Sequence, residues 1–255
     1  MKAAFCVNIF PHNEIMNAAC RLAQMGYHGI ELWDAFLMGQ DLEEVKNKLT
    51  AFKLEVAQMC PYFNFTGNAE ELETTMEIAR KYIDMARFLD CKRIRVFTGN
   101  RGSCEVDEKT YWQAVEGLKA VCGMAKDIQF ILETHDKNLT DTGPATVKLL
   151  NDTGMDNLKV NLQVPLDYGK EDVYESARML GEHVAHLHAH NWIGGWPKLT
   201  YLDSGDYDFR KFVEILSSKG FDGYISIEHG DHMGTKDPFE VAQHEIKYLK
   251  QVFGI

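Results

Sequence analysis

In four short segments of the second half of the sequence, one of the two alternating faces carries polar residues. The segments are residues 129–133, 159–163, 184–188 and 224–228. If each segment is a strand whose apolar side packs on helices, its polar side faces the opposite way. Four polar side chains then project near the carboxyl ends of these strands: Glu133, Gln163, His188 and Glu228.

A divalent metal ion is the simplest explanation for this set. Two buried carboxylates repel each other and take up protons unless a cation lies between them. Three oxygen-bearing side chains and an imidazole suit Mn²⁺, Mg²⁺, Co²⁺ or Zn²⁺, with water or substrate oxygens in the open positions. The alternative without a metal is a hydrogen-bonded polar core, in which Glu133 and Glu228 pair with Arg93 and Arg95. Four polar strand ends in succession favour the metal.

Proton transfer beside a carbonyl group is one chemistry that such a site could carry. A metal bound to adjacent carbonyl and hydroxyl oxygens acidifies the neighbouring C–H bond and stabilises the enediolate that forms when a base removes the proton. Glu133 and Glu228 are the predicted catalytic residues. On opposite faces of the substrate they would catalyse epimerisation, whereas transfer between neighbouring carbons would give isomerisation. Loss of a hydroxyl group β to the acidified carbon would give dehydration instead.

Other polar and aromatic residues are predicted to bind the substrate around this centre. They are Glu31, His135, Trp192 and Lys198. Glu31 and His135 share the inward parity of their segments, an indole such as Trp192 can cover a sugar face, and Lys198 can meet a phosphate or carboxylate. His186 is expected to lie beneath the metal rather than bind it. His229 and His232 are interpreted as loop residues and not as a metal pair.

The whole chain alternates between strand and helix patterns. Predicted strands begin near residues 3, 29, 55, 93, 129, 159, 184 and 224. Helical periodicity covers residues 14–24, 42–53, 69–89, 109–126, 140–151, 171–180, 209–218 and 239–253. Eight such units in about 250 residues predict a closed (β/α)8 TIM barrel of the α/β class, with residues 1–255 as a single domain. A doubly wound open sheet is the structural alternative.

Composition excludes several classes of protein. The 255 residues include 38 acidic and 27 basic ones, and a formal charge of −11 disfavours nucleic-acid and anionic-membrane partners. The six cysteines have no C-x-x-C spacing, which is unlike a disulfide framework or a zinc ribbon and is typical of a reducing compartment. Neither a signal-peptide core nor an apolar run of about 18 residues occurs, so a cytoplasmic location is expected.

Five motifs resemble the xylose isomerase-like TIM-barrel superfamily, which includes sugar phosphate isomerases and epimerases, hydroxypyruvate isomerase and ketose 3-epimerases. The motifs are Gly26-Tyr27-His28-Gly29-Ile30-Glu31-Leu32-Trp33, Leu132-Glu133-Thr134-His135, His186-Leu187-His188, Gly205-Asp206-Tyr207-Asp208-Phe209 and residues 220–229. The resemblance implies a metal held by Glu133, an acid of the sixth strand, His188 and Glu228. This sequence departs from the pattern at the sixth strand. Gln163 stands where the family has Asp and Leu166 where it has His, so the ligand charge falls from −3 to −2.

These observations predict a metal-dependent isomerase or epimerase of a small sugar, keto-sugar or hydroxy-keto acid. The closest alternative is a dehydratase of a polyol-derived ketone at the same site. A non-catalytic sugar-binding barrel is the third hypothesis, because of Gln163 and Leu166. The apurinic-site endonucleases of the superfamily need further histidines at the third and fourth strands, and residues 58–61 and 95–98 contain none. A homo-oligomer is compatible with the resemblance, although no sequence patch identifies an interface.

Overall fold

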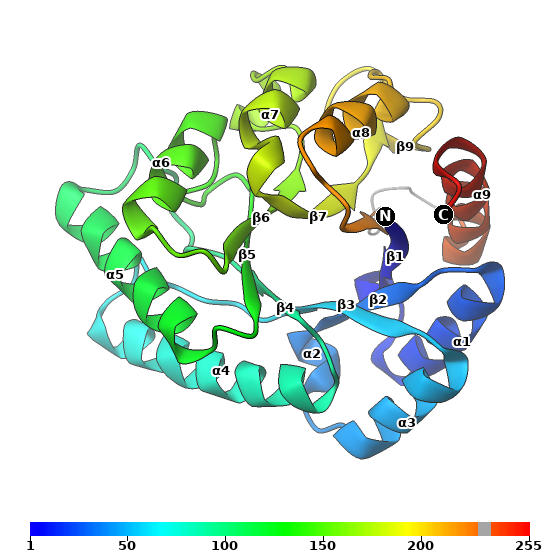
Figure 1. The fold of residues 1–255 in the computed structure, drawn as a ribbon, viewed down its shortest axis with the longest axis horizontal. Coiled ribbons are helices and arrows are strands. Elements are labelled where there is room, and N and C mark those ends of the chain that lie inside the picture. Colours follow the sequence, from blue (N-terminus) through cyan, green and yellow to red (C-terminus); the bar gives the residue numbers. More distant parts are fainter. Residues whose placement is uncertain (229–235) are drawn as a thin grey trace.

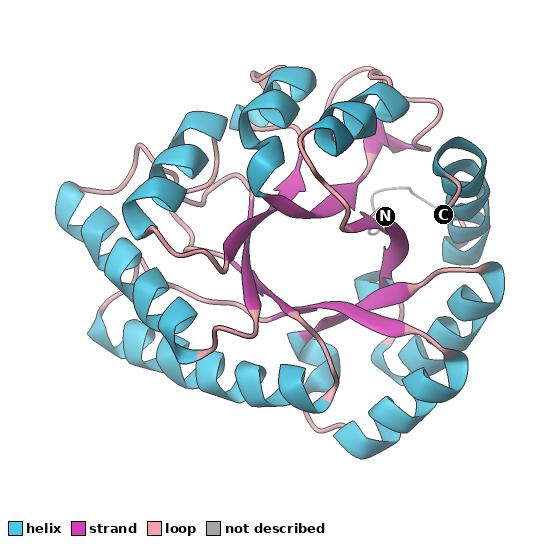
Figure 2. Ribbon diagram, in the orientation of Figure 1, coloured by secondary structure: helices cyan, strands magenta, loops and turns pink. Residues whose placement is uncertain are grey.

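The computed structural model describes residues 1–228 and 236–255 of the chain. Within these residues eight parallel strands close into a barrel, and helices surround it (Figures 1 and 2). The barrel strands are β1 (Lys2–Cys6), β2 (Gly29–Trp33), β3 (Glu55–Cys60), β4 (Arg93–Val96), β5 (Gln129–Glu133), β6 (Leu158–Gln163), β7 (Val184–Ala189) and β10 (Tyr224–Ile227). Because β1 pairs with both β2 and β10, the sheet has no edge, and the prediction of a (β/α)8 barrel over a doubly wound sheet is confirmed.

The helices follow the predicted series, with boundaries set by their caps. They are α1 (Ile15–Met25), α2 (Asp34–Leu37), α3 (Leu42–Phe52), α4 (Ala69–Phe88), α5 (Glu108–Met124), α6 (Gly143–Thr153), α7 (Val173–Leu180), α8 (Phe209–Ser218) and α9 (Pro238–Phe253). Most begin after a side chain that accepts a hydrogen bond from the first turn, such as Thr142 before α6 and Asp172 before α7. These caps explain why α6 and α7 start two or three residues later than the sequence pattern predicts.

The predicted facing of the strands is also confirmed. Phe130, Leu132, Val160 and Leu162 are completely buried and belong to the large apolar core between the barrel and its helices. The residues of the other parity point into the barrel. Apolar burial on the outer face of the strands therefore forces the polar set inward.

Two irregularities in strand pairing adjust which inward side chains meet. Ile30 is level with Val56, but Glu31 is level with Gln58, so β3 has one extra residue at this point. Asn161 likewise lies opposite His186, because β7 has one residue more than β6 there. Such bulges re-aim side chains without breaking the sheet. Here they bring Gln58 beside Glu31, and His186 beside Asn161.

The segment after β7 contains structure that the sequence pattern does not predict. Asn191–Trp192 (β8) and Leu199–Thr200 (β9) form a short antiparallel hairpin, where only a loop is expected. The short helix α2 directly after β2 was also missed. Both elements are too short to show a clear period in the sequence. Among residues 1–228 and 236–255, none of the helices combines the length and apolar character that crossing a lipid bilayer would need.

Candidate metal and active site

The four side chains predicted to form a metal site come together at the carboxyl ends of their strands. His188 Nδ1 lies 3.5 Å from Glu133 Oε1 and 3.0 Å from Glu228 Oε2. Gln163 and His188 occupy the same level of the neighbouring strands β6 and β7, and Glu228 directly follows β10. The three titratable members place their ligand atoms within 4.8 Å of one another. TIM-barrel active sites lie at this end of the barrel.

The terminal amide of Gln163 lies between the two carboxylates. With its nitrogen turned toward them, it donates hydrogen bonds of 2.9 Å to Glu133 Oε1 and to Glu228 Oε2. Thr134 holds the backbone of Gln163, because its hydroxyl both accepts from the Gln163 N–H and donates to the Gln163 carbonyl, each at 2.8 Å. Thr134 and Glu133 are neighbours in the chain, so this contact also sets Gln163 relative to Glu133.

The spacing of these atoms fits a divalent ion. Two ligand atoms that bind a metal at about 2.1 Å and at right angles lie about 3 Å apart. The distances from Gln163 and His188 to each other and to the two carboxylates run from 2.9 to 3.5 Å. Two carboxylates, an imidazole and an amide that can turn its oxygen inward are a suitable donor set for Mn²⁺, Mg²⁺, Co²⁺ or Zn²⁺. The residues present therefore fit the predicted metal.

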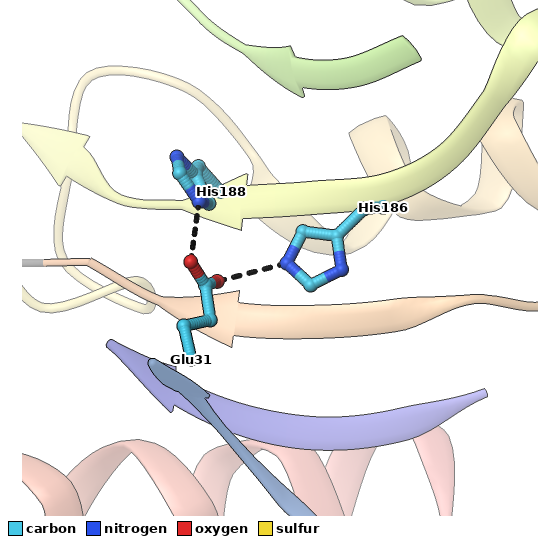
Figure 3. A group of neighbouring side chains, drawn as sticks. All are labelled: Glu31, His186 and His188. Atoms are coloured by element: carbon cyan, nitrogen blue, oxygen red, sulfur yellow. Dashed lines mark hydrogen bonds and ion pairs between the residues drawn. The ribbon is translucent and has the colours of Figure 1, made fainter. Parts of the chain in front are cut away.

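Glu31 contacts the imidazole of His188 (Figure 3), and it does so at Nε2, whereas Glu133 and Glu228 lie near Nδ1. Its Oε2 lies 3.1 Å from His188 Nε2, and both residues are completely buried. A carboxylate accepts the Nε2 proton, so Nδ1 is the nitrogen that faces Glu133 and Glu228 and that can bind a metal once its proton is lost. This is the arrangement that a metal-binding histidine requires. Glu31 was predicted to bind substrate, and the structure places it beneath His188, buried below the carboxylate pair.

A further ring of buried contacts holds Glu31 itself. His186 Nε2 lies 2.8 Å from Glu31 Oε1, and Gln58 Nε2 donates to Glu31 Oε2 at 2.9 Å. The thiol of Cys60 lies 3.4 Å from the same Oε2. His186 thus contacts Glu31 instead of the carboxylate pair, in the position below the centre that its parity indicates. The group of Glu31, His186 and His188 is explained by this hydrogen bonding without a second ion.

Electrostatics hold these acids ionised although they are buried. Burial alone would raise the pKa of Glu31, but the neighbouring His188 and His186 hold it well below its ordinary value. Burial likewise opposes ionisation of Glu133, and His188 and Arg95 outweigh it and lower the pKa of that carboxyl. Burial would lower the pKa of His188, whereas Glu228, Glu31 and Glu133 raise it well above its ordinary value. A positive charge at this position is therefore strongly favoured.

One half of the metal-free alternative is also present. Arg95 is completely buried, and its Nη1 lies 3.3 Å from Glu133 Oε2. Its guanidinium is surrounded by the rings of Trp33, Tyr62 and Phe97, with centroids 4.3 to 4.7 Å away. Arg93 instead lies over the ring of Tyr224, and Glu228 has no arginine partner among the described residues. The two glutamates therefore occupy different environments.

The remaining predicted substrate-binding residues lie farther out, and their role stays a prediction. His135 is exposed, donates from Nδ1 to the Asp136 carbonyl at 2.7 Å and contacts the Phe97 ring. Trp192 is buried in an aromatic cluster with Trp196 and Tyr207. Lys198 is exposed in the turn of the β8–β9 hairpin. His229 and His232 lie outside the described residues.

The sequence pattern does not predict three positioning contacts. These are the contact of Gln58 with Glu31, the contact of Thr134 with Gln163, and the packing of Arg95 among three aromatic rings. Gln58 and Arg95 share the inward parity of their strands, which is the signal that could have drawn attention to them. Thr134 has no such signal, because its contact depends on how closely β5 and β6 approach after Glu133.

Proteins of known structure and known activity share this architecture. A 3-dehydroshikimate dehydratase of Bacillus anthracis is 28% identical over 202 residues, which are 75% of this chain and 72% of that protein. The crystal structure of the probable 3-DHS dehydratase AsbF of Bacillus anthracis superposes with a TM-score of 0.83 at 23% identity, covering 98% of this chain and 99% of the other. A D-psicose 3-epimerase of Clostridium cellulolyticum H10, solved with D-tagatose, gives a TM-score of 0.83 at 16% identity and 99% coverage of both chains.

The family model described as xylose isomerase-like TIM barrel matches residues 20–252. That span covers every barrel strand except β1 and includes the four converging side chains. The chain belongs to the xylose isomerase-like TIM barrel family.

Proposed function

We propose that the protein is a metal-dependent enzyme that removes the proton beside the carbonyl group of a small polyhydroxylated ketone and expels a β-hydroxyl group as water. This is the dehydratase hypothesis, and the observation that carries it is the unequal engagement of the two glutamates. Its support from outside the chain is the 28% identity to a 3-dehydroshikimate dehydratase.

Glu133 is fully engaged by its neighbours. One of its oxygens pairs with Arg95, the other faces His188 and the Gln163 amide, and its side chain is 2% exposed. Glu228 directs Oε2 to the same two neighbours, but its Oε1 makes no hydrogen bond within residues 1–228 and 236–255, and its side chain is 16% exposed. Among the described residues, one carboxylate is thus engaged through both oxygens, while the other keeps one oxygen that could meet a substrate. A single general base suits elimination better than two-base epimerisation.

The residues have separable tasks in this mechanism. Glu133, Gln163, His188 and Glu228 would hold the metal. A bound divalent ion would polarise the substrate carbonyl and stabilise the negative charge that develops on its oxygen. Glu228 accepts the proton from the carbon beside the carbonyl, and the C–O bond to the β-hydroxyl breaks. The same carboxylic acid then protonates the departing hydroxyl group, so that water leaves and the carboxylate is restored.

Isomerisation or epimerisation is the second candidate, and the Gln163 contact favours it. The amide places Glu133 Oε1 and Glu228 Oε2 at equal distances of 2.9 Å from one atom, so both carboxylates border the same small volume. If substrate binding releases Glu133 from Gln163, two acids become available to exchange protons.

Product analysis separates the two candidates. Protein loaded with Mn²⁺ is incubated in D₂O with 3-dehydroshikimate, ketoses, ketose phosphates and inososes. Dehydration yields a product lighter by one water, which for 3-dehydroshikimate is the aromatic 3,4-dihydroxybenzoate. Epimerisation or isomerisation yields a product of unchanged formula that carries deuterium.

Variants link the activity to Glu228. Glu228→Gln should abolish both product formation and exchange of the substrate α-proton with solvent, because the amide cannot take up a proton. Glu240→Gln, an exposed glutamate on α9, is the matched control and should behave as the native protein. Native exchange rates in Glu228→Gln would remove this residue from the mechanism, and a metal-loaded protein inert toward the whole panel would favour a binding protein.

A further inference from the structure

A second cavity lies at the opposite end of the barrel from Glu133 and Glu228. Its volume is about 340 Å³, and it opens beside the amino ends of β3, β4 and β10, with helix α3 along one side. The charged residues lining it are Lys46, Glu55, Asp90, Lys92 and Arg93. Its size is at the small end of the range for ligand pockets, which begins at about 300 Å³.

Both acids of the cavity already have cationic partners. Lys2 reaches Glu55 from outside the lining, with its Nζ 2.6 and 2.7 Å from the two carboxylate oxygens, and the Tyr224 hydroxyl also bonds to Glu55. Lys46 Nζ lies 2.9 Å from Asp90 Oδ2. Each carboxylate is therefore neutralised before any ligand arrives.

The other two cations of the cavity have no such partner in the part of the chain that the structure describes. Within residues 1–228 and 236–255, neither Lys92 nor Arg93 forms an ion pair. The guanidinium of Arg93 is held over the Tyr224 ring, 5.1 Å from its centroid, and its Nε is buried with no acceptor. A partly buried arginine without a carboxylate is costly unless an anion binds it. The ring contact also fixes the guanidinium plane, which favours two-point recognition of an oxyanion.

We propose that this cavity binds a small dianion bearing a phosphate group, either inorganic phosphate or a phosphomonoester of sugar size. Lys92 and Arg93 supply two positive charges that form no ion pair among the described residues, and two such charges balance a phosphate at neutral pH. Thr50, also in the lining, offers a hydroxyl group from α3. The site is independent of the proposed function, because it lies at the amino ends of the strands while the carboxylate pair lies at their carboxyl ends.

The test is a titration of the ¹⁵N-labelled protein with inorganic phosphate at constant ionic strength, followed by backbone amide shifts. Saturable shifts are expected in residues 46–56 and 89–93, and an equal ionic strength of chloride should not produce them. Arg93→Gln should weaken phosphate binding at least tenfold, and Lys92→Gln, which changes an exposed side chain, at least threefold. If loss of Arg93 disturbs the folding of the amino-terminal end of the barrel, Lys92→Gln still tests the proposal.

Two controls locate the binding. Arg210→Gln removes a surface arginine that pairs with Glu214 on α8, and phosphate affinity should not change. Glu228→Gln should also leave the affinity unchanged, which separates this cavity from the metal site. Shifts that do not saturate, or that persist unaltered in both Lys92→Gln and Arg93→Gln, would overturn the proposal. Shifts confined to residues at the carboxyl ends of the barrel strands would instead assign the phosphate to the other end of the barrel.

Discussion

Gln163 stands where the resemblance to the family implies an acid, and Gln163→Glu should change the metal-free and the metal-bound protein in opposite directions. In the metal-free protein the amide nitrogen donates to Glu133 and Glu228 at 2.9 Å each. The substitution keeps the length of the side chain and replaces two hydrogen bonds to charged groups with two repulsive contacts. A divalent ion at the same place would convert the new carboxylate into a third anionic ligand.

The magnitude follows from the distances. Two carboxylates about 3 Å apart repel each other by roughly 5 to 6 kcal/mol at an effective dielectric constant of about 20. The variant avoids this repulsion by taking up a proton, and protonating a glutamate of pKa about 4.3 at pH 7 costs about 3.7 kcal/mol. The free energy of unfolding of the metal-free variant should therefore fall by up to about 4 kcal/mol. Metal affinity should rise about tenfold or more, because ligand charge sets affinity for hard ions.

Urea unfolding with EDTA and with Mn²⁺ measures the first effect, and competition with a fluorescent chelator measures the second. Gln58→Glu is the matched control, since it places a carboxylate against Glu31 and away from the carboxylate pair. It should destabilise the protein without tightening metal binding. Unchanged or weaker metal binding by a folded Gln163→Glu variant would refute the assignment of residue 163 to the metal site.

Three further predictions concern the residues around the metal site and a histidine at the amino-terminal end of the barrel. Glu31→Gln should weaken metal binding about 10- to 100-fold by chelator competition, because a neutral amide holds the His188 Nε2 proton less strongly than a carboxylate does. Cys60→Ala removes another contact of Glu31 and should bind the metal within about threefold of the native protein. Equal affinities of the two variants would contradict the role of Glu31. Arg95→Met should lower the free energy of unfolding by about 3 to 5 kcal/mol, since it leaves Glu133 buried without its ion pair. Arg87→Met, which removes an exposed ion pair with Asp127, should change the free energy of unfolding little. Similar losses in both variants would show that burial of the ion pair is irrelevant. Burial and the nearby Lys2 lower the pKa of His28, whose Nδ1 accepts a hydrogen bond from the Ala3 N–H. The stabilising contribution of neutral His28 is complete above about pH 6.5 and is lost as the pH falls toward the lowered pKa. The difference in unfolding free energy between the native protein and His28→Gln should therefore shrink between pH 7.5 and 5 in denaturant titrations, and a constant difference would refute the assignment.

The sequence predicts the barrel well because its signals are periodic. Strand parity depends on which residues can be buried against helices, and that preference is visible in segments such as Tyr224–Ile227. The convergence of Glu133, His188 and Glu228 follows from parity and from the closure of the barrel. Helix starts are less well predicted, because a single cap such as Thr142 decides them.

Parity does not tell how deep a side chain lies along the barrel axis. Depth depends on the stagger between strands and on bulges, which alternation of residue types does not encode. Glu31 is the example, since its parity is inward as predicted but its level places it beneath His188. Arg95 shows the same limit. Its contacts with Glu133 and with aromatic rings depend on how closely Trp33, at the end of β2, and Phe97, directly after β4, approach it.

The charge balance inside the barrel explains why an amide can stand at position 163. The sequence argument counts only the ligands, and on that count the exchange of Asp for Gln weakens the site. The structure adds Glu31 to the acids and Arg95 to the bases, and both are buried. Three carboxylates, Glu31, Glu133 and Glu228, are then balanced by Arg95 and one divalent ion when both histidines are neutral. A fourth acid would add a negative charge, which is most costly in the metal-free protein, where no divalent ion balances it. With Arg95 inside the barrel, a neutral amide at position 163 keeps the buried charges balanced.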